Sequence, residues 1–386
     1  MSGITLMMLG NFALAGGVSP ASLWGWGDNY NGAAARNSTE AGGRYSSPVQ
    51  LGSDSDWLDV EGSYNFTATR ESGYLYSCGD GRFGCWNTGL NASSPIQIGS
   101  LTNWTGAGAM LAQEQNGAKA IKADGTLWSW GENQGGVMGI SQGTGVSDGY
   151  LRYSSPVQIG SLTTWAFTTG GGNGPAAAVN KAGELFTWGD GTYGALGANT
   201  NGISRSSPVQ VGSLSNWSTG ASGSYMHFFV KTDGTAWVWG QNGYGQLGLG
   251  NTTTYSSPVQ LGSATDWSAP SCGYQNMAGI RSGKLYSWGR NNSGGVGDGT
   301  VVQRNSPVQI GSLTNWLDVQ TGNQMAVALK TNGTLWSWGA NYQGQAGQST
   351  KDPVKYSSPV QIGSLTNWSR IHFGISSSST CWALKA

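Results

Sequence analysis

The chain has 386 residues, and only 10% of them are charged, with 19 Lys and Arg against 19 Asp and Glu. Without a basic surplus the composition argues against nucleic-acid binding, and 65 glycines with 19 tryptophans argue against a disordered chain or a helical solenoid. The remaining class is a compact, glycine-rich, all-β protein.

The first segment in chain order, residues 1–17, is an apolar tail that is interrupted by Gly10 and Asn11. It is too short to span a bilayer, so no transmembrane segment is predicted. It ends in a small-residue A-L-A sequence like a cleavage site, but no Lys or Arg precedes it, so we interpret it as a docking tail with a signal peptide as the alternative. The side chains that would dock are Leu6, Met7, Met8, Leu9 and Phe12.

Two motifs then repeat seven times along the chain with a period of about 52 residues. The string SPVQ, or SPIQ, begins at Ser47, Ser94, Ser155, Ser207, Ser257, Ser306 and Ser358. After it come a glycine and a lone tryptophan, at Trp57, Trp104, Trp165, Trp217, Trp267, Trp316 and Trp368. The second motif, LWSWG in its best copies, ends at Gly27, Gly79, Gly131, Gly189, Gly240, Gly289 and Gly339.

Each repeat is predicted to form about four short strands, which is the size of a propeller blade. In the best copy, residues 326–339, two alternating runs flank Asn332-Gly333, a hairpin turn in which both residues tolerate positive φ. Similar turns are expected at Asp124-Gly125 and Asp233-Gly234, with weaker versions at Ser72-Gly73, Ala182-Gly183 and Ser282-Gly283. A further strand is expected after SPVQ, and another after the lone tryptophan.

The two ends of the chain carry complementary halves of one hairpin. Residues 380–386, TCWALKA, match its first half, and residues 23–27, LWGWG, match its second half. The sequence therefore predicts an all-β, seven-bladed β-propeller whose last blade is closed by the N- and C-terminal strands, which removes the open edges of the array. Residues 18–386 would then form a single domain.

The GTLWSWG and SPVQ motifs resemble the regulator-of-chromosome-condensation-type repeat family of seven-bladed propellers. Gln241 to Gly250 is the closest local match, and the resemblance covers Ser19 to Ala386. The recurring sequence SSPVQIGSLTNW is similar to repeats in bacterial and phage-associated sequences. The family usually places a histidine three residues after a glycine, where this chain has Asn65, Asn276 and Met325. The resemblance therefore implies the fold, and not the exchange-factor activity on a small GTPase.

No set of residues in the sequence indicates catalysis, a metal or a cofactor. The only histidines are His227 and His372. Acidic residues follow the W-G motif at Asp28, Asp80, Glu132 and Asp190, but the other copies carry Gln241, Arg290 and Ala340, so no symmetric metal ring is expected. Cys78 and Cys85 either form a disulfide or, like Cys272 and Cys381, are buried free thiols. We predict a non-enzymatic protein without cofactor or metal.

The tryptophans mostly follow the repeat, because 17 of the 19 lie in the two motifs. This regularity favours packing between blades, with a sugar-stacking platform as the alternative. Binding residues are instead expected where the copies differ, on loops. The candidates are the loop aromatics Tyr30, Phe83, Tyr193, Tyr244 and Tyr342 and the insertion residues Asp148, Tyr150, Lys351 and Lys355.

The predicted function is that of a structural or interaction protein, a rigid propeller in a virion (phage capsid, tail or fibre) or at a bacterial cell surface. Its partners would be other proteins of the assembly or a host receptor, with a glycan as an option and nucleic acid excluded. One alternative is a secreted protein-binding inhibitor similar to the propeller-type β-lactamase inhibitor. Another is a propeller that binds or cleaves glycans.

Overall fold

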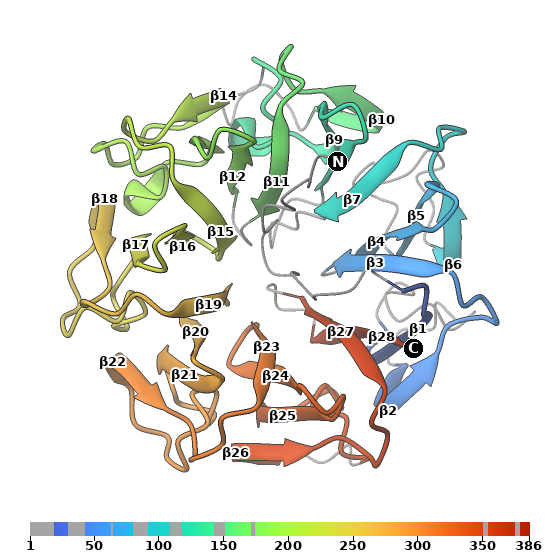
Figure 1. Ribbon diagram of the computed structural model, residues 1–386, viewed down its shortest axis with the longest axis vertical. Helices are drawn as coiled ribbons and strands as arrows, with labels where there is room; N and C mark the ends of the chain where they lie inside the picture. Colours follow the sequence, from blue (N-terminus) through green and yellow to red (C-terminus); the bar gives the residue numbers. More distant parts are fainter. Residues whose placement is uncertain are drawn as a thin grey trace, which may run out of the picture.

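Seven four-stranded antiparallel sheets are arranged in a ring (Figure 1). The computed structural model describes residues 19–29, 43–62, 65–79, 92–108, 117–142, 151–170, 174–349, 354–374 and 379–386. In these residues the only helical elements are two single turns of 3-10 helix, η2 (Gln134–Gly136) and η3 (Thr192–Gly194). None of the described helices is long and apolar enough to cross a membrane. The predicted all-β, seven-bladed propeller is confirmed.

Each sheet is one blade, with its first strand nearest the axis of the ring and its fourth at the rim (Figure 1). The first strands all begin at the lone tryptophan, and they are β3 (Trp57–Gly62), β7 (Trp104–Gly108), β11 (Trp165–Gly170), β15 (Trp217–Ser222), β19 (Trp267–Cys272), β23 (Trp316–Thr321) and β27 (Trp368–Phe373). The second strands are β4 (Asn65–Arg70), β8 (Gly117–Lys122), β12 (Pro175–Asn180), β16 (Met226–Lys231), β20 (Asn276–Arg281), β24 (Met325–Lys330) and β28 (Thr380–Lys385).

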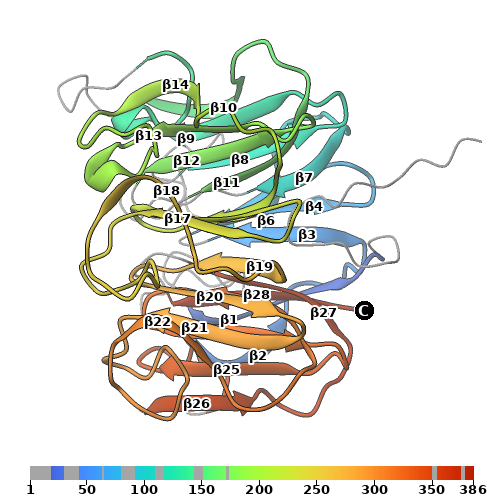
Figure 2. The same ribbon diagram turned by 60° about the vertical axis from the view of Figure 1, so that its left-hand side comes forward.

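The third and fourth strands complete each blade. The third strands end at or just after the glycine of the W-G motif, and they are β5 (Leu75–Gly79), β9 (Leu127–Glu132), β13 (Leu185–Gly189), β17 (Ala236–Gly240), β21 (Lys284–Gly289), β25 (Leu335–Ala340) and β1 (Ser22–Asp28). The fourth strands all end at the Gln of SPVQ or SPIQ, and they are β6 (Ala92–Gln97), β10 (Arg152–Gln158), β14 (Arg205–Gln210), β18 (Tyr255–Gln260), β22 (Arg304–Gln309), β26 (Lys355–Gln361) and β2 (Arg44–Gln50). Figure 2 shows the blades from another side, with connecting loops at the ends of the strands.

The position of SPVQ corrects one expectation. This motif lies inside the fourth strand, whereas we expected a strand to come after it. The strand includes the motif because its proline lies on the rim, where a missing N–H is tolerated. After the motif the chain crosses to the next blade instead.

The seventh blade joins the two ends of the chain, as predicted. Its strand order is β2-β1-β28-β27, and β1 pairs with β28 continuously from Ser22 opposite Lys385 to Gly27 opposite Thr380. Ala21 then exchanges two backbone hydrogen bonds, of 3.0 and 3.1 Å, with Trp57 in the first blade. The ring is thus closed by main-chain pairing rather than by side chains alone.

The W-G motif is explained by two features of the blade. Its glycine has a φ between +93° and +114° in all seven copies, and at Gly240 an added Cβ would lie 2.1 Å from the carbonyl oxygen of Tyr225. Only glycine fits this bulged position. The preceding tryptophan is fully buried in the six blades that have one.

In five of those blades the indole Nε1 donates to a carbonyl of the preceding blade. These bonds are Trp26 to Gln345 (2.9 Å), Trp188 to Val137 (2.8 Å), Trp239 to Ala195 (2.9 Å), Trp288 to Gln246 (2.8 Å) and Trp338 to Gly295 (3.0 Å). These buried rings and their hydrogen bonds link neighbouring blades, which confirms that the tryptophans pack between blades as predicted.

The hairpin turns form where expected, with one difference in mechanism. Gly333 has a φ of +73°, but Asn332 does not take a positive φ. Its side-chain oxygen instead accepts hydrogen bonds from the backbone N–H (3.2 Å) and hydroxyl (2.8 Å) of Thr334, and that hydroxyl accepts one from the indole of Trp336 (2.9 Å). Asp124 and Asp233 organise their turns in the same way.

Beside these turns, a cation from the second strand lies between two aromatic rings of its blade. Lys330 Nζ is 4.7 Å from the ring centroid of Trp316 and 3.5 Å from that of Trp336. Lys122, Lys231 and Arg70 repeat the arrangement in other blades. Such cation–π contacts occupy the faces of the half-buried tryptophans, which leaves little room for a sugar-stacking platform there.

Candidate functional site

One end of the ring gathers the loops that carry the candidate binding residues. Because the strands of a blade alternate in direction, the loops between first and second strands and between third and fourth strands emerge together. We call this end the loop face. In the four best described blades it comprises residues 190–204, 223–225, 241–254, 273–275, 290–303, 322–324 and 341–349. The opposite end, with the hairpin turns, is the hairpin face.

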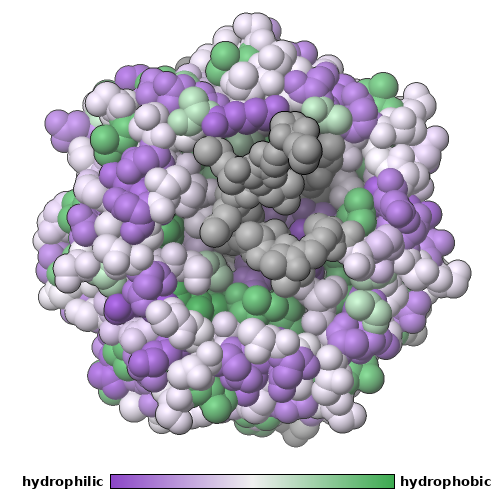
Figure 3. Space-filling model, viewed as in Figure 1, coloured by the Kyte–Doolittle hydropathy of each residue, from purple (hydrophilic) through white to green (hydrophobic). Residues whose placement is uncertain are grey.

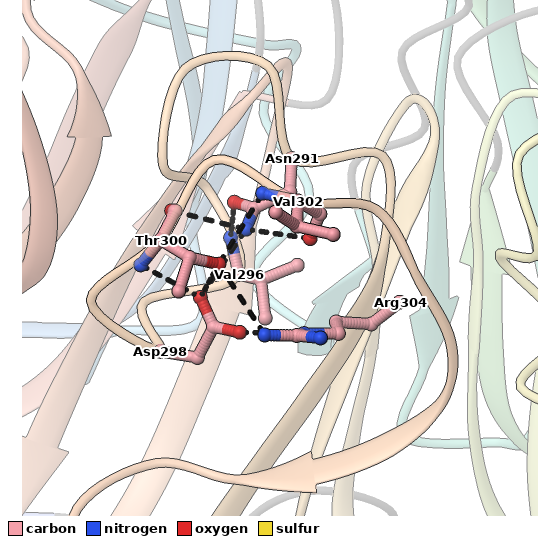
Figure 4. A network of polar contacts seen from close by, with 6 residues as sticks. All are labelled: Asn291, Val296, Asp298, Thr300, Val302 and Arg304. Carbon is pink, nitrogen blue, oxygen red and sulfur yellow. Dashed lines mark hydrogen bonds and ion pairs between the residues drawn. The ribbon is translucent and has the colours of Figure 1, made fainter.

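Buried asparagines hold the long loops of three of these blades in place, whereas the loop that carries Tyr193 has Gly191 at the same position. Figure 4 shows the network around Asn291. Asn291 Nδ2 donates to the carbonyl oxygens of Thr300 (3.1 Å) and Val302 (3.0 Å), and its Oδ1 accepts from the backbone N–H of Val296 (2.9 Å). Asp298 accepts from Thr300 and pairs with Arg304 Nε at 2.6 Å. These groups satisfy one another, so the loop between β21 and β22 is rigid.

The same asparagine occurs two residues after the W-G glycine in other blades. Asn133, Asn242 and Asn341 each accept from a backbone N–H five residues later, at 2.9 to 3.1 Å. Asn242 also donates to the carbonyl oxygens of Asn251 and Thr253. The repeated W-G-x-N pattern is the sequence signal for this asparagine, which was not among the predicted functional residues.

Three of the predicted loop tyrosines lie on the loop face. The side chains of Tyr193 and Tyr342 are 39% and 45% exposed, while Tyr244 is half-buried. Tyr193 packs edge-to-face on Tyr225 of the next blade, with ring centroids 5.3 Å apart. The hydroxyl of Tyr342 lies 3.4 Å from that of Ser293 in the preceding blade. Each contact joins two neighbouring blades, and we call Tyr193, Tyr244 and Tyr342, with the residues they contact on these four consecutive blades, the arc.

Arg290 lies within this arc and was not among the predicted binding residues. Its guanidinium carbon is 5.0 Å from the ring centroid of Tyr244, and its Nη1 donates to Gln275 Oε1 at 2.5 Å. Lys355, one of the predicted binding residues, is exposed, and its Nζ donates to the backbone oxygen of Asn292 at 3.2 Å. Arg290 could have been found because it replaces the acidic residue that follows W-G in several copies.

Two residues of the loop face occupy a strained backbone conformation. Tyr193 has a φ of +58° and Gln324 a φ of +61°, in the left-handed region that favours glycine. Gln324 accepts a hydrogen bond from the hydroxyl of Ser293 at 2.7 Å. Retaining a long side chain at a strained position is a feature of functional surfaces.

The other predicted binding residues fall outside the part of the chain that the structure describes. They are Tyr30, Phe83, Asp148, Tyr150 and Lys351, together with Leu6, Met7, Met8, Leu9 and Phe12 of the tail. The structure therefore places Tyr193, Tyr244, Tyr342 and Lys355 on the loop face, and the binding role of all the candidates stays a prediction.

The titratable groups that could support chemistry are buried within the blades. Burial lowers the pKa of His227 to about 3 and that of His372 to about 4, so both imidazoles are neutral. Cys78, Cys272 and Cys381 are buried, and burial raises the pKa values of their thiols. Cys85 lies outside the described residues. Within the described ranges no three His, Cys, Asp or Glu side chains cluster as a metal site.

Comparison with known families bears directly on this architecture. The regulator of chromosome condensation (RCC1) repeat matches residues 182–230, 233–279, 282–329 and 332–380, together half of the chain, and a second form of the repeat matches residues 316–345. The chain belongs to this family. The RCC1 repeat is thus the unit of which the propeller is built.

Two curated relatives share the sequence at a moderate level. The human E3 ubiquitin-protein ligase HERC2 is 26% identical over 365 residues, which is 89% of this chain and 7% of HERC2. The mitochondrial RCC1 domain-containing protein RUG3 of Arabidopsis thaliana is 26% identical over 190 residues, 48% of this chain and 42% of RUG3. The chain therefore spans only part of these relatives.

Solved structures of RCC1-type propellers share the fold. Prp20p of Saccharomyces cerevisiae superposes with a TM-score of 0.80 at 17% identity, over 98% of this chain and 93% of Prp20p. Human WBSCR16 superposes with a TM-score of 0.79 at 17% identity, over 95% and 98% of the two chains. The relatives named here are eukaryotic, so they give no support to the expected bacterial or phage branch.

Proposed function

We propose that this chain is a non-enzymatic protein-interaction module whose loop face binds another protein. The observation that carries the proposal is the arc of Tyr193, Tyr244, Arg290 and Tyr342, of which the last three lie on loops pinned by buried asparagines. Tyrosine and arginine are the residues that most often anchor protein interfaces. Rigid loops also lose little conformational entropy on binding, which favours affinity.

The relatives support the class of function but not the identity of the partner. Prp20p has been characterised for its binding to Gsp1p and histones, and yeast RCC1 (Prp20) has been solved bound to Kap60. These interactions belong to those proteins, which are 17% and 18% identical to this chain. The ligase activity of HERC2 is likewise not carried over, because the alignment covers 7% of that protein.

The test is to isolate the protein with its native partner and to compare variants of its two ends. Tyr193→Ala combined with Tyr342→Ala should abolish recovery of the partner, because both exposed rings would be lost from the arc. Leu313→Ala, which removes a 46% exposed side chain from the hairpin face, is the matched control and should retain the partner. Loss of the partner only in the Leu313 variant would place binding at the wrong end and refute the proposal.

The setting of the protein stays a prediction. A virion or cell-surface location gains no support from the human, plant and yeast relatives, and fractionation of the source material with an antibody to the chain would decide it. Deleting residues 2–17 tests the docking tail separately. The truncated protein should remain a folded monomer that no longer joins its assembly, and continued assembly would contradict the tail's predicted role.

The alternative of a secreted inhibitor would use the same loop face. Mass spectrometry of protein from the native source separates the two settings, since a mature chain that starts after Ala15 would indicate secretion. A glycan array on which the protein binds no glycan would contradict the glycan-binding alternative.

A further inference from the structure

We infer that the partner presents an acidic, extended segment, and that Arg290 and Lys355 form the anchor for its carboxylates. This inference rests on the proposed function, because it names the chemistry of the partner that the loop face would bind. The anchor joins two blades, since Arg290 comes directly after β21 and Lys355 begins β26.

The positive charge of Arg290 is held in a fixed orientation by neutral groups. Besides the bond to Gln275, its Nε and Nη2 lie 3.3 and 3.2 Å from the side-chain oxygen of Asn292, in the amide orientation that satisfies both groups. Tyr244 covers one face of the guanidinium. These partners use three of its five N–H groups, leaving one on each Nη without a partner among the described residues. Two N–H groups of one guanidinium can bind a carboxylate.

No described acidic residue neutralises this charge. Arg290 forms no ion pair within the described ranges. Asp298, in the same loop, pairs with Arg304 at 2.6 Å. The carboxylate of this loop is therefore already bound, whereas Arg290 has no acidic partner among the described residues.

Lys355 adds a second cation at the same place. Its Nζ donates to the backbone oxygen of Asn292, the residue whose side chain contacts Arg290. The positive charges of Arg290 and Lys355, which both contact Asn292, repel each other. An anion bound between them would offset this electrostatic repulsion. Carboxylates on one chain would meet this requirement and continue along the arc.

The rest of the arc favours an acidic polypeptide over a nucleic acid. The tyrosines Tyr193, Tyr225 and Tyr342 supply aromatic faces and hydroxyl donors on both sides of the anchor. A nucleic acid needs many cations along its phosphates, but this chain has 19 basic and 19 acidic residues. Figure 3 shows hydrophilic and hydrophobic residues intermixed over one end of the ring, in keeping with this neutral composition.

The experiment uses the full chain and a fluorescein-labelled peptide of eight glutamates, followed by fluorescence polarisation at low salt. A Gly-Ser peptide of the same length and an oligothymidylate are the comparison probes. Arg290→Gln and Lys355→Gln should each weaken binding of the acidic peptide by about tenfold, the effect expected for one charge-assisted hydrogen bond. Lys284→Gln removes a charge from the other end of β21 and should bind like the unaltered protein.

The outcomes separate this inference from the proposed function. Failure of the acidic peptide to bind, equal binding by the Arg290 variant, or equally tight binding of the oligothymidylate would each overturn the acidic-segment inference. If Tyr193→Ala with Tyr342→Ala loses the native partner while Arg290→Gln keeps it, the inference fails and the proposed function stands. Unchanged urea unfolding of each variant shows that altered binding is not lost folding.

Discussion

The contact between a loop glycine and the tryptophan of the next blade allows a quantitative test of how the ring is held together. Gly297 has a φ of +85°, and an added Cβ would lie 2.6 Å from Nε1 and 2.7 Å from Cδ1 of Trp338, a fully buried ring. Gly297→Ala therefore combines an unfavourable backbone, costing about 1–2 kcal/mol, with overpacking, costing about 1–3 kcal/mol. We expect a loss of about 2–5 kcal/mol in the free energy of unfolding.

The control for this variant is Gly311→Ala. Gly311 has a φ of +62°, but no atom lies within 4 Å of an added Cβ, so only the backbone cost of about 1–2 kcal/mol applies. Urea unfolding at fixed pH measures both variants, and the shift in midpoint should come without a change in slope. Gly248→Ala and Gly262→Ala repeat the pair in the neighbouring blade, with Trp288 as the crowded ring. Equal losses in the crowded and uncrowded variants would refute the role of the tryptophan contact.

Three further outcomes are expected from the buried polar groups. Asn291→Ala should destabilise the protein by about 2–3 kcal/mol in urea unfolding, because it leaves buried backbone groups of the loop unpaired. Burial lowers the pKa values of His227 and His372 to about 3 and 4 in the folded protein, below the unfolded value of about 6.5. As the pH falls, the unfolded chain therefore binds these protons before the folded protein does. The free energy of unfolding should fall as the pH drops below 6.5. Burial raises the pKa of Asp318 to about 7, so the folded protein binds this proton before the unfolded chain does. This partly offsets the loss of stability from the two histidines, and the free energy of unfolding should fall by about 1.4 kcal/mol per pH unit between pH 6 and 4.5. Asp318→Asn removes the offset, and urea midpoints measured over this range should then fall about twice as steeply, while an unchanged slope would contradict these assignments.

The fold could be predicted from the sequence because the repeat fixes both period and closure. Two motifs at the same spacing defined seven blades, and the split hairpin at the termini defined how the ring closes, as the pairing of β1 with β28 confirms. The boundaries of the fourth strand were wrong because the strand was expected after SPVQ, whereas it includes the motif. Its proline suits a rim strand as well as a turn, and sequence alone does not distinguish the two.

The candidate site was only partly predictable, for a physical reason. Tyr193, Tyr244 and Tyr342 were found because they vary between copies on loops. In the sequence, Arg290 stood out only because it occupies the position after W-G where several other repeats have an acidic residue. Its contact with Tyr244, which lies in another blade, is visible only in the structure. A contact between residues more than 40 positions apart leaves no local pattern in the sequence.

The residue directly after W-G shows where this scaffold can carry function. The glycine before it must take a positive φ, and the asparagine after it pins the loop, so neither can change without loss of stability. The position between them varies, and it holds Glu132, Gln241, Arg290 and Ala340 in different blades. Of the seven copies only one places a cation there, next to a tyrosine and without an ion pair among the described residues. A repeat protein that keeps its framework so closely from blade to blade can acquire a single asymmetric binding surface at this position, because the substitution leaves the ring intact.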